Sequence, residues 1–91
     1  MLKINIARRV EKFLEQLTPK HGRQLAAKIL QLRGDPYPSD SKELKSHSLP
    51  WRRATAGEYR IIYRVEEDTL FVEIVGKRND DEVYRQFRRL S

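Results

Sequence analysis

The sequence has 91 residues, no cysteine and only two histidines, His21 and His47. Without cysteine, the chain can form neither a disulfide framework nor a thiolate metal site, and two scattered histidines are too few for a zinc site. No apolar run is long enough to span a membrane, and no secretory segment follows Met1. We therefore expect no metal, no cofactor and no membrane partner. A reducing, cytoplasmic setting fits this composition.

The length and the composition indicate one small globular domain that occupies residues 1–91. Hydrophobic residues make up 38% of the chain and charged residues 35%, with a net charge of +6 and a pI of about 9.9. Residues 1–33 carry eight Lys and Arg against two Glu, so they hold the whole excess. A charge of this size favours a polyanionic partner, although a solvated surface explains the charge alone equally well.

The first third of the chain predicts a short strand and two helices. Residues 2–6 alternate between apolar and polar side chains, as a strand does. Two apolar stripes with helical spacing follow: Val10, Phe13, Leu14 and Leu17, then Leu25, Ile29 and Leu32. Thr18 and Pro19 suit the N-cap and first position of the second helix, and Gly34 closes that helix before a loop at 35–41.

The rest of the chain predicts three strands and a short helix. The strands are expected at 49–55, 59–65 and 69–75, with a polar turn at 66–68, and Asn79 can cap the final helix. The fold class is α+β. A small antiparallel-rich β-sheet carries an N-terminal helical hairpin on one face and ends in a short C-terminal helix, in the order β-α-α-β-β-β-α.

Basic side chains and one tyrosine gather around the two central strands. Period-2 alternation places Arg60, Ile62 and Arg64 on one strand face, which we expect to stay open because the hairpin covers the other. Lys77 and Arg78 follow the adjacent strand. Tyr84 lies about one and a half turns into the last helix, which can fold back to aim the phenol at the same rim. The segment before the central strand adds three more cations: Lys45, Arg52 and Arg53.

Cations and a phenol without metal ligands suit work on an RNA phosphodiester. The 2′-hydroxyl can attack its own phosphate while a base takes its proton, an acid protonates the leaving oxygen and cations stabilise the added charge. Arginine suits this because its planar fork grips two phosphate oxygens. Each residue also has a structural reading: Arg60 as a surface residue paired with Glu73, and Tyr84 as an aromatic at the core edge. Only the combination of these residues favours a functional interpretation over a structural one.

Three stretches resemble the RelE/ParE superfamily of bacterial and archaeal toxins. Residues 35–38 (DPYP) with 42–45 (KELK) are similar to its loop after the hairpin, and 57–63 (GEYRIIY) are similar to its central strand signature. Residues 76–78 (GKR) with 82–84 (EVY) are similar to its C-terminal block, in the form typical of the RelE branch. The resemblance covers nearly the whole chain and implies a RelE-like fold.

The RelE branch implies a toxin of a type II toxin–antitoxin system that cuts mRNA on the ribosome, without a metal, and inhibits translation. By resemblance, Arg60 stabilises transition-state charge, Arg78 contacts the scissile phosphate and assists leaving-group protonation, and Tyr84 orients or stacks on the substrate. Two lysines of that branch fall where this chain has Arg52 and Arg53, which can supply charge but not a general base. We assign Lys45, Arg52, Arg53 and Lys77 to RNA binding.

Several points stay open at the level of sequence. The general base is unassigned; His47 is the one nearby imidazole, a group that titrates near neutrality, and we do not favour it. The expected partners are an acidic antitoxin encoded beside the toxin, the ribosome with mRNA in its decoding site, and operator DNA bound by the antitoxin complex. The alternatives are a ParE-like toxin that inhibits DNA gyrase without nuclease activity and a non-catalytic RNA-binding domain.

Overall fold

The computed structural model describes residues 1–45, 48–79 and 81–90. The elements in chain order are β1 (Lys3–Ile6), α1 (Arg8–Glu15), α2 (Pro19–Gly34), β2 (Lys42–Glu43), β3 (Arg52–Ala56), β4 (Tyr59–Glu66), β5 (Thr69–Lys77) and α3 (Glu82–Arg89). This order confirms the expected α+β fold and adds β2, which is too short to show a periodic pattern in the sequence. In the part of the chain described, no helix is both long and apolar enough to cross a membrane.

The strands form one mixed sheet in the order β1-β5-β4-β3-β2. β1 runs parallel to β5, and the other neighbours are antiparallel, so the sheet is antiparallel-rich as expected. β3 and β4 are joined by a two-residue turn in which Gly57 has a φ of +59°. Glycine adopts this left-handed conformation without a steric penalty, so the hairpin turn depends on residue 57.

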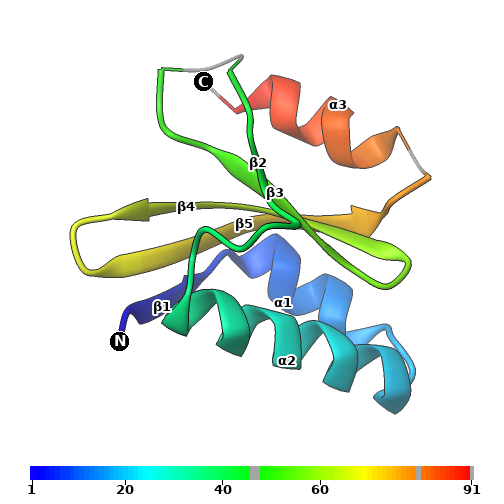
Figure 1. Ribbon diagram of the computed structural model, residues 1–91. Coiled ribbons are helices and arrows are strands. Elements are labelled where there is room, and N and C mark those ends of the chain that lie inside the picture. Colours follow the sequence, from blue (N-terminus) through cyan, green and yellow to red (C-terminus); the bar gives the residue numbers. More distant parts are fainter. Residues whose placement is uncertain (46–47, 80, 91) are drawn as a thin grey trace.

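The helical hairpin α1–α2 covers one face of the sheet (Figure 1). Val10, Leu25 and Leu32 from the two predicted stripes are fully buried there. They pack in one cluster with the alternate residues Tyr59, Ile61, Tyr63, Leu70 and Val72 of the two central strands. Thr18 caps α2 as predicted, since its side chain accepts a hydrogen bond from the His21 backbone N–H at 3.5 Å. This face is the main hydrophobic core.

A polar clamp holds the segment between α2 and β2 against the hairpin side of the sheet. Lys28 is buried in the apolar stripe of α2, and its ammonium forms an ion pair with Asp40 at 2.6 Å. The Tyr63 hydroxyl donates to the Pro36 carbonyl at 2.6 Å. Burial raises the pKa of the Tyr63 phenol above its usual value, against the opposing effect of hydrogen bonds with Ser41 and Arg52. Periodicity alone did not reveal this clamp.

The sequence led us to expect that the opposite face of the sheet stays open, but this face is partly covered. The helix α3 packs across part of it, and Val83 and Phe87 form a second buried cluster with Trp51, Ile62 and Ile74. Figure 1 shows α3 on the side of the sheet away from α1 and α2. The expectation was wrong because Val83 and Phe87, one helical turn apart, give even this short helix an apolar side that must be covered.

Two local details also differ from the prediction. A β-bulge between β4 and β5 pairs Ile62 with Ile74 but Tyr63 with Val72, so Glu73 is the extra residue. Glu73 forms an ion pair with Arg9 of α1 at 3.8 Å, and not with Arg60. The helix α3 begins at Glu82 with Asp81 at the N-cap position, so Asn79 is not its cap. Tyr84 therefore lies in the first turn of α3.

Candidate functional site

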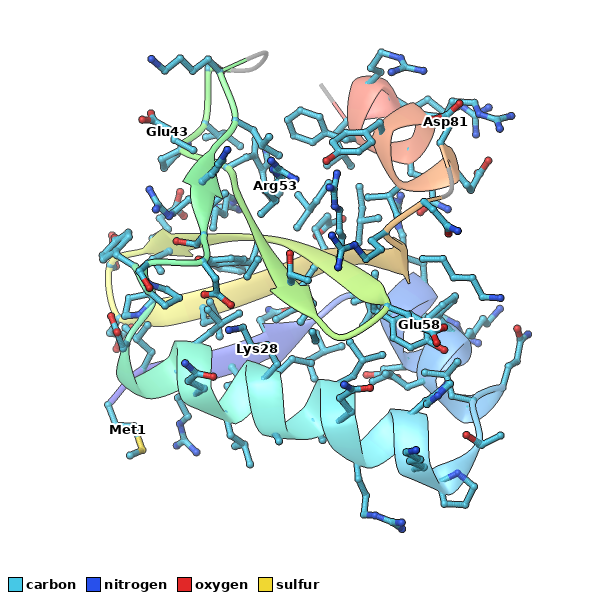
Figure 2. All side chains as sticks on the ribbon, turned by 45° about the vertical axis from the view of Figure 1, so that its right-hand side comes forward. Met1, Lys28, Glu43, Arg53, Glu58 and Asp81 are labelled. Atoms are coloured by element: carbon cyan, nitrogen blue, oxygen red, sulfur yellow. The ribbon has the colours of Figure 1, made fainter. Side chains whose placement is uncertain are left out.

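The α3 side of the sheet brings Arg60, Arg53 and Tyr84 together. The Tyr84 hydroxyl accepts a hydrogen bond from Arg60 Nη1, and it accepts a second from Arg53 Nη1 at 3.3 Å. The Arg60 guanidinium carbon also lies 5.4 Å from the centre of the Tyr84 ring. Figure 2 shows Arg53 extending from β3 toward α3. The expectation that the last helix folds back to bring its phenol to Arg60 is confirmed.

The strand register explains why these side chains meet. Arg53 pairs with Ile62 and Thr55 pairs with Arg60, so Arg53 and Arg60 project from the same face of two neighbouring strands. Gly76 of β5 lies opposite Arg60 on the other side. A Cβ atom at Gly76 would overlap the Val83 side chain, so this glycine permits the close approach of α3 that brings Tyr84 over the sheet.

The site is polar and incompletely satisfied. The Nε atom of Arg60 is buried and has no hydrogen-bond partner among the described residues. The Nε atoms of Arg52 and Arg64 are buried without a partner as well, so this feature is shared by three arginines of the sheet and is not specific to the site. Because the phenol oxygen accepts from two guanidinium groups, its own proton is free for a third group. The arrangement can hold an anion and donate a proton to it.

Two other arginines near the site are engaged elsewhere. Arg52 projects from the opposite face of β3 to Arg53, donates to the Ser41 hydroxyl at 2.8 Å and lies 5.1 Å from the Tyr37 ring. Arg64 lies over the rings of Trp51 and Phe71, at 5.4 and 4.3 Å, and pairs with Glu66 at 3.0 Å. Period-2 alternation in β3 was the signal that could have separated Arg52 from Arg53.

The remaining predicted site residues do not contact this group in the described structure. Lys77 and Arg78 are exposed at the end of β5, where they line a pocket of about 320 Å³ with Glu58 and Asn79. Lys45 is exposed between β2 and β3. His47 lies outside the described residues. Within those residues no group of three His, Cys, Asp or Glu side chains is placed to hold a metal ion.

The contact of Arg53 with Tyr84 was not expected from the sequence, where Arg53 was assigned only to RNA binding. Glu58 was not singled out at all, although it occupies the turn that leads into the central strand. Its position next to Arg78 follows from the pairing of β4 with β5, since Tyr59 lies opposite Lys77. The register in which the two strands pair was not evident from the sequence.

Comparisons with known proteins give a family and a set of similar folds. A family model described as "ParE toxin of type II toxin-antitoxin system, parDE" matches residues 4–82. No curated protein sequence is significantly similar to the chain. The fold is similar to RelE in an archaeal RelE–RelB complex from Pyrococcus horikoshii OT3, with 25% identity, a TM-score of 0.76, and 86% of this chain and 96% of that chain covered.

Two further structures have the same fold at lower identity. A mutant of Escherichia coli RelE in the free state has a TM-score of 0.74 at 22% identity, covering 99% of this chain and 98% of that one. The RelB–RelE antitoxin–toxin complex from Methanococcus jannaschii gives 0.67 at 21% identity, covering 96% of this chain and 99% of that one. At these identities the two matches are evidence of the fold alone.

Proposed function

Because the chain belongs to the RelE/ParE superfamily of type II toxin–antitoxin toxins, we propose that it is a ribosome-dependent endoribonuclease that cuts mRNA by 2′-hydroxyl attack. The observation that carries this proposal is the Tyr84 phenol held by the guanidinium groups of Arg60 and Arg53. A purely structural tyrosine at a helix start needs no such pair of cations.

Each member of the group has a role in this reaction. Arg60 stabilises the charge that develops on the phosphorane, and Arg53 adds a second cation on the same face. Tyr84 supplies the proton that the leaving 5′-oxygen needs, because its oxygen already accepts two hydrogen bonds. Arg78 and Lys77, exposed at the end of β5, bind the phosphate backbone of the substrate.

In this proposal the ribosome is required to position the mRNA for cleavage. The decoding site must bend the mRNA so that the 2′-hydroxyl lies in line with the leaving oxygen. The test is to incubate the purified toxin with free mRNA and with mRNA on programmed ribosomes, with and without EDTA. We expect cleavage only on ribosomes and no direct effect of EDTA on the chemistry. Efficient cleavage of free RNA would contradict the proposal.

The second candidate function is inhibition of DNA gyrase without RNA cleavage, which the ParE description of the matching family favours. The two candidates predict different responses to brief induction in cells. A nuclease stops translation and leaves new 5′ ends within codons, whereas a gyrase inhibitor triggers DNA damage signalling. Gyrase supercoiling with the purified toxin completes the comparison. We expect no inhibition of supercoiling.

An acidic antitoxin is the proposed partner, since two of the similar structures are complexes of RelE with RelB. The helices α1 and α2 present exposed cations to such a segment: Arg8, Arg9, Lys12, Lys20 and Arg23. Charge speeds association more than it slows dissociation, so raising salt should reduce the on-rate and leave the off-rate nearly constant. Stopped-flow mixing with the product of the adjacent gene measures both. The antitoxin complex is also proposed to bind operator DNA.

A further inference from the structure

Glu58 lies directly opposite Arg78, where β4 begins and β5 ends. Tyr59 pairs with Lys77 in the last register position, and the pairing extends by one residue, because the Arg78 N–H donates to the Glu58 carbonyl at 2.7 Å. Residues opposite each other on paired strands have Cβ atoms about 5 Å apart. Glu58 and Arg78 accordingly line the same 320 Å³ pocket, together with Lys77 and Asn79.

The charged side chains in this pocket have no structural partner among the described residues. Within the part of the chain that is described, neither the Glu58 carboxylate nor the Lys77 and Arg78 cations form an ion pair or a side-chain hydrogen bond. All three residues are exposed. A carboxylate beside two cations without a closed ion pair is available to a substrate that brings both a phosphate and a hydroxyl group.

Glu58 is also close to the Arg60 group. It lies in the β3–β4 turn, two residues before Arg60, and its backbone partner Arg78 lies two residues beyond Gly76, the partner of Arg60. Figure 2 shows Glu58 at the turn between β3 and β4, next to the strand that carries Arg60. Arg60 thus contacts Tyr84 of α3 and follows Glu58 by two residues at the start of β4.

The proposed reaction needs a proton acceptor that the Arg60 group cannot provide. Arginine stays protonated and cannot serve as a base. The Tyr84 oxygen is occupied by two guanidinium donors. Among the described residues that line the pocket, only Glu58 carries a carboxylate, a group that accepts protons in many enzymes.

We propose that Glu58 is the general base of the cleavage reaction, an inference that rests on the proposed nuclease function. The carboxylate removes the proton of the 2′-hydroxyl as the 2′-oxygen forms its bond to phosphorus. The bond from phosphorus to the 5′-oxygen breaks, and that oxygen takes the proton of the Tyr84 phenol. The products are a 2′,3′-cyclic phosphate and a 5′-hydroxyl end. Solvent then removes the proton from Glu58 and returns one to Tyr84.

The test compares single-turnover cleavage of mRNA on programmed ribosomes by the wild-type toxin, Glu58→Gln and Tyr84→Phe. A second mRNA carries sulfur in place of the scissile 5′-oxygen, a leaving group that departs without protonation. We expect Glu58→Gln to be slower by roughly 10²–10⁴-fold on both mRNAs. Tyr84→Phe should be slow on the normal mRNA and close to wild type on the sulfur mRNA. Glu67→Gln, at the far turn between β4 and β5, is the matched control and should cut normally.

Added formate separates a base from a residue that only positions its neighbours. Cleavage by Glu58→Ala should increase with formate concentration and not with chloride, because a small carboxylate can replace the missing base. Three results would overturn the assignment: Glu58→Gln within about threefold of wild type, recovery of Glu58→Gln on the sulfur mRNA, or no response of Glu58→Ala to formate. A wild-type toxin that leaves ribosome-bound mRNA intact would instead overturn the proposed nuclease function itself.

Discussion

The two faces of the sheet are built from the same strands but are filled with different side chains. The hairpin face holds the larger cluster, in which Leu25, Ile61 and Tyr63 are fully buried and the clamp residues are paired. The α3 face has a smaller apolar cluster next to arginines, of which Arg60 keeps a buried Nε without a partner in the described structure. One face therefore holds most of the buried apolar side chains, and the other brings arginines and the Tyr84 phenol together beside a smaller apolar cluster.

The difference shows how a small domain can separate folding from chemistry. Alternation along β4 sends Tyr59, Ile61 and Tyr63 into the core and Arg60 to the other side. A substitution on the hairpin face should therefore change stability with little effect on the rate of cleavage per folded molecule. A substitution on the α3 face should change the rate of cleavage with little effect on stability. The predictions below test this separation, from the largest expected effect to the smallest.

Leu25→Ala tests the hairpin face. Leu25 is fully buried, and truncating such a leucine destabilises a core by about 2–5 kcal/mol, so the variant should unfold at a much lower urea concentration. Leu30→Ala, on the same helix but at a residue that is 58% exposed, should change stability little. Cleavage by the folded fraction of Leu25→Ala should stay near wild type. A large loss at equal folded concentration would show that the two faces are coupled.

Arg60→Ala and Arg64→Ala test the α3 face with two arginines on one strand. Removing the Arg60 charge should raise the cleavage barrier by about 2.7–4 kcal/mol while the urea midpoint stays nearly constant. Arg64 packs on the Trp51 and Phe71 rings, so its loss should reduce stability by about 1–2 kcal/mol and spare cleavage. Cleavage rates on ribosomes and urea unfolding, measured for both variants, test these two expectations. Equal cleavage by wild type and Arg60→Ala would remove Arg60 from the site.

This pair of arginines also shows how far the sequence alone could lead. The stripes on α1 and α2 and the central strands β4 and β5 were predictable because their patterns are local. The different environments of Arg60 and Arg64 were not, since they depend on where Trp51, Phe71 and Tyr84 lie after folding. The bulge at Glu73 and the start of α3 depend on packing between distant segments for the same reason.

Gly76→Ala tests whether α3 must lie close to β5. The added methyl group would overlap Val83, and overpacking of this kind typically costs about 1–3 kcal/mol. Cleavage should also fall, because moving α3 moves Tyr84 away from Arg60. Gly22→Ala is the matched control: nothing lies within 4 Å of its new methyl group, so this helical position should gain stability. Adding Val83→Ala to Gly76→Ala should restore part of both losses if the overlap is their cause.

Tyr63→Phe is expected to change the stability of the fold least, and the size of this change depends on pH. Below about pH 10 the change removes one hydrogen bond to the Pro36 carbonyl and should reduce stability by about 0.5–1.5 kcal/mol. Burial raises the pKa of the folded Tyr63 phenol, so above pH 10 the unfolded chain loses this proton first. Ionisation then favours unfolding, and wild type loses stability that Tyr63→Phe keeps, by up to about 1.4 kcal/mol per pH unit.

Urea unfolding of wild type and Tyr63→Phe from pH 8 to pH 11 measures how the difference in stability between the two proteins changes with pH. The stability difference should be constant up to about pH 10 and then shrink or change sign, because only wild type has a buried phenol at position 63. Lysines that titrate in the same range affect both proteins equally and cancel in the difference. Tyr37→Phe, at a tyrosine that is 60% exposed, should run parallel to wild type. Parallel curves for Tyr63→Phe would mean that the hairpin face does not keep the phenol neutral, and that its polar clamp is weaker than its burial implies.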